Sequence, residues 1–470
     1  MKENNLTNGP VLKSLLKIAV PIIFANILAT AYQLTDTFWV GRLGTNAVAA
    51  VSISFPVIFL MIALGGGLSI AGTILVSQYK GKEDKNAVNH VTGQTFLMIV
   101  IISILIASIG YFLSPFFMKF MGADPEVFKS AVEYMKITFI GIVFMFTYEV
   151  FQSLMRGVGD VKTPVFIILG TVLLNLLLDP LFIFGYGSMP GYGVAGAAIA
   201  TIGTQGLASV IGVSLLIRGK HQIKLNLKDL VPDFPLIKKM LKIGFPASIE
   251  QSTRALGMLI MVFIVATFGT QTLAAYGIGG RVLSFIIIPA LGLSIATSAL
   301  VGQNIGAGKV NRAEKIVKIS SLTGFIVLTF VGILTFIFAN QISAFFIPGE
   351  IETINSSALF IKIISLTFGF IGVDMSMNGA FRGSGNTMTS MTLSIVSLWV
   401  LRFPLAYLLS KHTSLAEIGI WIAFPIANVI VASISAIIFL KGSWKETKIT
   451  EDIKLKTDTT QETIIEEGLS

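Results

Sequence analysis

Long apolar stretches separated by short polar connectors make up most of the chain. A bilayer core of about 30 Å is crossed by a helix of roughly 20 apolar residues, so each stretch is long enough to span it. Six precede the polar stretch 218–235 and six follow it. The pattern predicts an all-α polytopic membrane protein with about twelve transmembrane helices. Their approximate centres are Ile27, Phe59, Ser103, Phe139, Leu173, Gly206, Leu256, Ile287, Val327, Thr367, Val396 and Ile430.

Composition supports a membrane protein and argues against several kinds of site. Of 470 residues, 54% are hydrophobic and only 13% are charged, more apolar surface than a soluble fold can bury. The absence of cysteine excludes disulfides and thiolate metal sites. The three histidines lie far apart in polar connectors, so no zinc site is expected. We therefore expect no cofactor beyond a coupling ion.

The net charge of +9 follows the connectors and does not indicate affinity for nucleic acid. Lysine and arginine gather in every second connector, which is the positive-inside pattern of membrane proteins. It predicts a multi-pass protein of the cell (inner) membrane, with both termini and the central loop in the cytoplasm. The start of the chain lacks a cleavable-signal pattern, so we expect the first span to direct insertion.

The two halves of the chain are repeats. Leu16–Pro21 matches Leu241–Pro246 at an offset of 225 residues, and Arg156–Gly159 matches Arg382–Gly385 at 226. Six spans per repeat is an even number, so the repeats should be parallel and related by a pseudo-two-fold axis along the membrane normal. This arrangement predicts a V-shaped, two-lobed transporter. The expected divisions are an N-lobe at 1–222, an inter-lobe loop at 223–236, a C-lobe at 237–444 and a disordered polar tail at 445–470.

Polar residues converge at one depth in the first repeat. Asp36 lies near the outer end of the first span, and a charge inside a span costs about 2.5–3.5 kcal/mol on insertion scales. Asn175 and Asp179 share one face of the fifth span, near its outer end, and Thr201 lies near the outer start of the sixth. Together these oxygens predict a site for H+ or Na+. The alternative is that the two aspartates only tie helices together.

The sequence also offers candidates for a substrate cavity. Tyr32 and Gln33, about one turn before Asp36, are candidates for a substrate cavity. In the second repeat, Glu250 and Asp374 are candidates for the same cavity, with a purely structural role left open; Glu250 and Arg254 are four apart and can pair on one helix face.

Three further motifs predict, in turn, stabilised helix ends, a hinge and the absence of a nucleotide site. Arg156 and Arg382 are expected to stabilise helix ends beside glycine turns. Pro21 removes a backbone hydrogen bond fifteen residues before Asp36 and is a candidate hinge. The run Gly302–Val310 resembles a phosphate loop but fails on spacing and on the final residue, so no nucleotide is expected.

These motifs together resemble the multidrug and toxic compound extrusion (MATE) family, nearest its prokaryotic DinF-like branch. The resemblance covers about residues 10–440 and rests on Pro21, Tyr32–Asp36, Arg156–Asp160 and Asn175–Pro180, with the run Gly196–Thr201. It implies a twelve-helix antiporter in which the positions of Asp36, Asn175, Asp179 and Thr201 form an N-lobe cation site. It also implies bending of the first helix near Pro21.

The predicted function is secondary multidrug efflux by alternating access. H+ or Na+ would be exchanged for organic, cationic amphipathic compounds, with the lipid bilayer as surroundings and the protein as a monomer. The alternative is a flippase for lipid-linked or polysaccharide substrates, which would need a cationic groove for anionic head groups. An enzyme or a receptor is disfavoured, because the sequence shows no nucleophile–base or metal motif and the duplication is typical of transport proteins.

Overall fold

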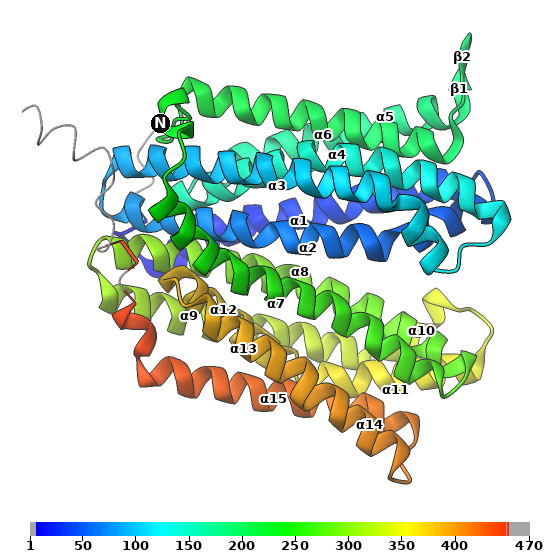
Figure 1. Ribbon diagram of the computed structural model, residues 1–470. Helices are drawn as coiled ribbons and strands as arrows, with labels where there is room; N and C mark the ends of the chain where they lie inside the picture. The colour runs from blue at the N-terminus through cyan, green and yellow to red at the C-terminus, as the bar shows by residue number, and fades with distance from the viewer. Residues whose placement is uncertain (1–5, 448, 451–470) are drawn as a thin grey trace, which may run out of the picture. The chain divides into compact units, whose positions relative to one another are not determined.

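A computed structural model describes residues 6–447 and 449–450, and they are almost entirely helical (Figure 1). The helices of the first repeat are α1 (Val11–Gly41), α2 (Thr45–Gly81), α3 (Lys85–Phe120), α4 (Pro125–Val158), α5 (Lys162–Phe184) and α6 (Gly193–Arg218). Between α5 and α6, β1 (Gly185–Tyr186) pairs antiparallel with β2 (Met189–Pro190).

A 3-10 turn, η1 (Leu227–Leu230), precedes the second repeat. The remaining elements are α7 (Phe234–Ala266), α8 (Thr270–Gly306), α9 (Val310–Ile337), α10 (Ala339–Phe346), α11 (Ile351–Ser365), α12 (Phe368–Ser384), α13 (Thr387–Ile395), the π-helix η2 (Val396–Arg402), α14 (Phe403–Lys411), α15 (Glu417–Lys441) and the 3-10 turn η3 (Ser443–Glu446). Within the described chain, eleven helices are long and apolar enough to span a membrane, or twelve with the bent pair α11–α12 counted as one. The predicted fold class is confirmed.

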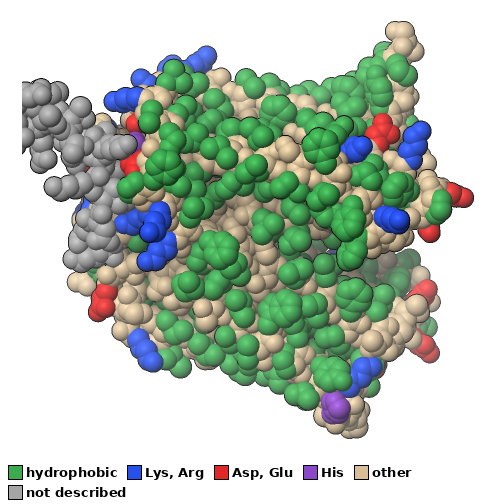
Figure 2. Space-filling model, viewed as in Figure 1, with side chains coloured by type: hydrophobic (Ala, Val, Ile, Leu, Met, Phe, Trp, Pro, Cys, Tyr) green, Lys and Arg blue, Asp and Glu red, His purple; other side chains and the backbone are tan. Residues whose placement is uncertain are grey.

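The helix surfaces are those of membrane spans. Large apolar side chains are exposed along the helices, among them Phe112 at 77% and Phe166 at 70%. Figure 2 shows hydrophobic side chains over the helix faces and Lys, Arg, Asp and Glu gathered toward the helix ends. A helix that is apolar around its whole circumference is stable where lipid replaces water, because its backbone groups are all satisfied internally.

Each repeat packs in the same way around its fourth span. In the first repeat α4 packs against α2, α3 and α6, and in the second α12 packs against the equivalent α8, α9 and α15. Each core also packs a phenylalanine against a helix glycine, though between different helices: Phe139 of α4 contacts Gly110 of α3, and Phe360 of α11 contacts Gly279 of α8. Phe360 further stacks on Trp421 with ring centroids 4.2 Å apart. The duplication seen in the sequence is therefore also a duplication of helix packing.

The described chain divides into two compact units at different places from the predicted lobes. One unit comprises 24–248 and 449–450, the other 6–23 and 249–447. The predicted lobes divide instead at 222 and 237. The difference arises because the first part of α7 packs with the first unit, where Ser248 Oγ donates to Leu64 O at 2.6 Å. The first part of α1 packs with the second unit, where Gly292 lies against Ile23.

The segment predicted as an inter-lobe loop, 223–236, is packed against the start of α3. Gln94 is fully buried; its amide donates to Asp229 O and Val231 O at 2.7 Å each and accepts from Asp233 N at 2.9 Å. The ring nitrogens of His90 lie 3.3 and 2.9 Å from carboxylate oxygens of Asp229 and Asp233. We call residues 226–233 the α7 strap, since they fix the point at which α7 begins.

A second strap, formed by Thr7 and Asn8, precedes α1. Lys309 Nζ donates to Thr7 O at 3.2 Å and to Asn8 Oδ1 at 2.8 Å, and Arg312 donates to Asn8 O at 3.0 Å. Asn8 and Asp233 occupy equivalent places in the two repeats, 225 residues apart, and each precedes a proline by two residues. The straps are thus a repeated feature that the apolar pattern alone did not indicate.

Two predicted spans are irregular. The helix pair α11–α12 bends by 51° at the predicted centre Thr367, whose Oγ1 accepts from Asn428 Nδ2 at 3.3 Å. The span centred on Val396 contains the π-helix η2, which ends two residues before Pro404. Proline supplies no N–H, so a wider turn here accommodates the lost helix hydrogen bond. Of the predicted tail, Lys445 and Glu446 close η3, and 451–470 lie outside the described residues.

Candidate functional site

The four residues predicted as a cation site meet in the first compact unit. Asp36 comes from α1, Asn175 and Asp179 from α5, and Thr201 from α6. Thr201 Oγ1 donates to Asp36 Oδ2 at 3.1 Å, and Asn175 Nδ2 donates to Asp179 Oδ1 at 2.9 Å. The carboxyl group of Asp179 lies close enough to that of Asp36 for its charge to act on it. Helix spacing explains the α5 pair, because residues four apart lie one above the other.

Three oxygens of this cluster are buried without a protein partner. They are Asp36 Oδ1, Asn175 Oδ1 and Asp179 Oδ2, and the side chains of Asn175 and Asp179 are fully buried. A buried acceptor without a donor costs about 1–3 kcal/mol, and more when it is charged. All three groups are acceptors, so a proton or a small cation is the kind of group that would satisfy them. These three acceptor oxygens therefore fit a positively charged ligand.

Three tyrosine and threonine hydroxyls surround the cluster. Tyr32 is buried; its hydroxyl donates to Thr201 O at 3.3 Å and is hydrogen-bonded to Thr204 Oγ1. Tyr134 of α4 lies near both carboxylates. Neither Thr204 nor Tyr134 is among the site residues predicted from the sequence. The spacing of Thr204, one turn beyond Thr201, could have indicated it, whereas the proximity of Tyr134 depends on how α4 packs.

Two other predicted residues lie apart from the cluster. Gln33 is exposed, and its backbone carbonyl accepts from Thr37 Oγ1 at 2.9 Å. Pro21 lies in the part of α1 that belongs to the second compact unit, and α1 continues through it as one helix. The described residues contain no group of three or more His, Asp and Glu side chains arranged to hold a metal ion. An alkali cation or a proton, which needs fewer carboxylates, fits the two aspartates better.

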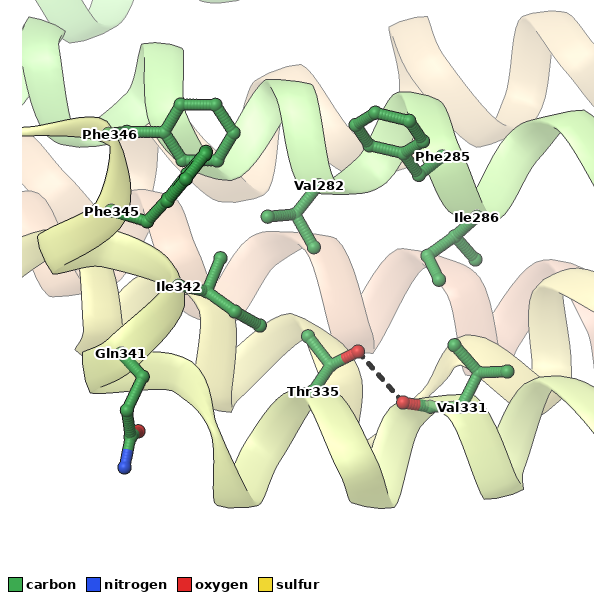
Figure 3. A pocket seen from close by; sticks show the side chains of 9 residues that line it. All are labelled: Val282, Phe285, Ile286, Val331, Thr335, Gln341, Ile342, Phe345 and Phe346. Atoms are coloured by element: carbon green, nitrogen blue, oxygen red, sulfur yellow. Dashed lines mark hydrogen bonds between the residues drawn. The ribbon is translucent and has the colours of Figure 1, made fainter. Parts of the chain in front are cut away.

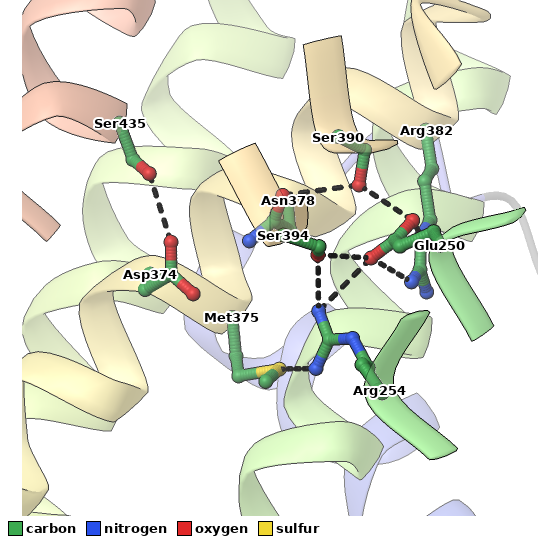
Figure 4. Close-up of polar contacts among 9 residues, drawn as sticks. All are labelled: Glu250, Arg254, Asp374, Met375, Asn378, Arg382, Ser390, Ser394 and Ser435. Atoms are coloured by element: carbon green, nitrogen blue, oxygen red, sulfur yellow. Dashed lines mark hydrogen bonds and ion pairs between the residues drawn. The ribbon is translucent and has the colours of Figure 1, made fainter. Parts of the chain in front are cut away.

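In the second compact unit, Glu250 is fully buried and fully paired (Figure 4). Its Oε1 accepts from Arg254 at 2.9 Å and Arg382 at 2.6 Å, and its Oε2 accepts again from Arg382 at 3.2 Å. The hydroxyls of Ser390 and Ser394 complete its shell at 2.9 and 3.1 Å. The pairing with Arg254 agrees with the helix spacing. The bidentate bond from Arg382 is new, since that arginine was expected only to stabilise a helix end.

Asp374 lies beside the Glu250 ion-pair cluster and is bonded to a different helix (Figure 4). Its Oδ1 accepts from Ser435 Oγ at 2.8 Å, and it feels the charges of Arg254 and Arg402. Arg402 donates to Asn428 Oδ1 at 3.0 Å and lies 4.7 Å above the Phe424 ring. Because Glu250 has no free oxygen, Asp374 is the better placed of the two carboxylates to meet a ligand.

Comparison with known proteins agrees with the duplication of the chain and with its fold. The MatE family model matches residues 21–181 and again 246–408, so its two matches begin at the repeat-equivalent prolines. The chain is 29% identical to the probable multidrug resistance protein YoeA of Bacillus subtilis, covering 94% of this chain and 96% of that protein. It is 30% identical to the probable multidrug resistance protein YpnP of the same organism, covering 96% and 99%.

A solved structure shows the same fold. The chain matches the crystal structure of MATE in complex with MaL6 with a TM-score of 0.87 and 25% identity, covering 96% of this chain and 99% of that one. The family model leaves out α6 and α15, the last span of each repeat, whereas the relatives match 94% and 96% of the whole chain. The chain belongs to the MATE family of membrane transporters.

Proposed function

We propose that this transporter exports organic compounds in exchange for a cation bound at Asp36, Asn175, Asp179 and Thr201. The observation that carries the proposal is the set of three buried, unpartnered acceptor oxygens shared by α1 and α5. The relatives named as probable multidrug resistance proteins support organic, drug-like substrates. Cationic amphipathic substrates suit a transporter whose first unit places two carboxylates among membrane helices.

A proton fits the cluster better than Na+. One proton between Asp36 and Asp179 would pair one carboxyl with the other, while a hard cation usually takes about six oxygen ligands. Only three free oxygens face the cluster among the described residues. Na+ coupling would require water molecules, or a rearrangement that brings the Tyr32 hydroxyl into the site and turns the oxygen of the Thr201 hydroxyl toward the ion.

Coupling follows from how the two aspartates are held. Asp36 is bonded to α6 through Thr201, and Asp179 is bonded within α5 through Asn175. Charging or neutralising the pair changes the attraction among α1, α5 and α6, and so shifts the balance between conformations of the first unit. An inward ion gradient then drives export, because one charge moved through 100 mV is worth about 2.3 kcal/mol. We place both chain termini in the cytoplasm on the positive-inside pattern.

The test is exchange in proteoliposomes with independently imposed pH and Na+ gradients. Asp36→Asn should abolish ion-driven efflux of a cationic dye, leaving less than about a hundredth of the wild-type rate, because a neutral amide cannot take up the ion. Glu133→Gln on α4 is the matched control, since Glu133 is an exposed carboxylate one residue from Tyr134. The control should retain the full rate.

Three results would overturn parts of the proposal. Undiminished exchange by Asp36→Asn removes the coupling role of the cluster. A rate that follows the Na+ gradient at fixed pH replaces the proton by Na+. An equal loss of efflux rate in Glu133→Gln would mean that the assay reports misfolding and not lost coupling. Misfolding would also show as a loss of monodispersity in the purified variant.

A second candidate is export of anionic compounds, including lipid-linked substrates. It is favoured by the second unit, where Arg254, Arg382 and Arg402 outnumber the carboxylates of Glu250 and Asp374. The same vesicles distinguish it with two dyes of equal size, one cationic and one anionic. We expect the cationic dye to be exported faster; the reverse order supports the anionic candidate.

A further inference from the structure

An apolar crevice opens between α8, α9 and α10 in the second compact unit (Figure 3). Its volume is about 490 Å³, within the usual range for small-molecule sites. Phe345 and Phe346 of α10 flank one end and Phe285 of α8 the other, with Val282 and Ile342 between them. Two lining residues are polar. The hydroxyl of Thr335 donates to Val331 O at 2.8 Å, and Gln341 is exposed, with its amide pointing away from the other lining side chains (Figure 3). The lining therefore suits a hydrocarbon chain.

The crevice opens onto the surface that faces lipid. Phe285 is 64% exposed and Phe345 is 80% exposed, and both side chains contribute to its lining. α9 ends immediately before α10, so the α10 end of the crevice is also the end of the span. The crevice runs from this end along α8 (Figure 3). Since α8 is long and apolar enough to span the membrane, acyl chains of the surrounding leaflet would run in the same direction.

An arginine lies at the α10 end of the crevice. The guanidinium of Arg281 lies 5.5 Å from the centre of the Phe346 ring, and its neighbour Val282 lines the crevice. Arg281 is exposed, and no described carboxylate lies within ion-pair distance of it. A free guanidinium in such surroundings needs an anionic partner or water.

The side chain of Arg281 can reach the level of a lipid head group. α8 has 37 residues and is therefore about 55 Å long, some 25 Å longer than the hydrocarbon core. Arg281 is eleven residues beyond Thr270, which is about 16 Å along the axis. With α8 centred in the bilayer, Arg281 begins just inside the hydrocarbon boundary, and its long side chain reaches the phosphate level.

We propose that this crevice is a binding site for an anionic phospholipid, with an acyl chain between α8, α9 and α10 and the phosphate paired with Arg281. The ring of Phe346 holds the guanidinium at the mouth of the crevice, so that its donors face the head group. The site lies in the second unit and does not include the carboxylates assigned to ion coupling. Its occupancy therefore does not depend on the proposed function.

Native mass spectrometry of the full chain with phosphatidylglycerol and phosphatidylcholine of identical acyl chains tests the proposal. Arg281→Gln should lower the affinity for the first bound phosphatidylglycerol molecule by about tenfold, which is the contribution of one charge-assisted hydrogen bond. The affinity for phosphatidylcholine should change by less than about twofold. Arg42→Gln is the matched control, because Arg42 is also exposed and lies over aromatic rings, those of Phe38 and Trp39, outside the crevice. It should change neither affinity.

A second measurement locates the lipid. Phosphatidylglycerol with a photoreactive acyl chain should label crevice residues of α8 and α10, and Arg281→Gln should remove that label. A similar crevice of about 470 Å³ between α5 and α6, lined by Phe166 and Leu207, supplies the internal comparison, since its labelling should not respond to Arg281→Gln. Equal binding of both lipids, equal loss in the Arg42 and Arg281 variants, or labelling confined to other helices would each overturn the proposal.

Discussion

At the scale of single residues, the two carboxylate clusters of this transporter have opposite designs. The Asp36–Asp179 pair leaves buried acceptor oxygens unpartnered, and on these oxygens we base the proposed cation site. Glu250 is surrounded by donors from two arginines and two serines. Buried ion pairs contribute little net stability when intact, but removal of one partner leaves an uncompensated charge that is expensive. Glu250 is accordingly a group on which the stability of the second unit depends.

The order of stability losses among its partners is predictable. Glu250→Gln leaves both arginines unpaired and should lower the free energy of unfolding by about 3–5 kcal/mol. Arg382→Gln should cost less, since Arg254 remains, and Arg254→Gln least, because its side chain is 27% exposed while that of Arg382 is 13% exposed. Thermal unfolding of the purified variants measures the order. A loss for Arg254→Gln equal to that for Glu250→Gln would contradict it.

At the scale of elements, the straps determine where α1 and α7 begin. The α7 strap lies so close to α3 that Gly93 faces the backbone of Asp229, where an added Cβ would stand 2.4 Å from the carbonyl oxygen. Only glycine permits this approach, which in turn allows Gln94 to reach its three backbone partners. The strap is therefore an integral part of the first unit.

Gly93→Ala should displace the α7 strap. The added methyl group must separate α3 from Asp229, which breaks the Gln94 and His90 contacts and should speed amide hydrogen exchange over 226–233 by at least about tenfold. The control is Gly203→Ala in α6, where nothing lies within 4 Å of the added Cβ. That change should leave exchange at the strap unaltered and stabilise α6 by up to about 1 kcal/mol. Unchanged exchange in Gly93→Ala would show that the strap does not depend on this contact.

At the scale of the whole molecule, α1 and α7 are the helices that belong to both compact units. The unit boundary falls after Ile23 in α1 and after Ser248 in α7. In each case it lies two residues beyond a proline, Pro21 or Pro246. Proline weakens a helix by removing one hydrogen bond and crowding the preceding turn. Each of these helices therefore has its weakest hydrogen bonding, at the proline, close to the residue where it passes from one compact unit to the other.

Pro246→Ala should slow transport without lowering stability. Restoring the missing hydrogen bond stiffens α7 at the unit boundary, so we expect a several-fold lower efflux rate with an unchanged or higher unfolding temperature. Pro56→Ala is the control, since Pro56 lies inside α2, wholly within one unit. Equal slowing in both variants, measured in the same proteoliposomes, would mean that the boundary position has no special role.

The sequence by itself determined the spans, the duplication and the depth of the candidate site. Apolar length is a local property and lipid requires continuous helices, so the pattern predicted every long span. The four predicted cation-site residues share one depth because helix direction places the ends of α1 and α5 and the start of α6 on the same side of the membrane. Packing of the three helices then brings their side chains together.

Only the tertiary structure decided which distant groups pair. The bond between Glu250 and Arg382 joins residues 132 positions apart, and the approach of Tyr134 to Asp36 depends on the packing of α4. The straps, the bend at Thr367 and the crevice beside Arg281 likewise arise from contacts between elements. Helix periodicity specifies which face a residue occupies, but the partner of that face is set by side-chain packing across the fold.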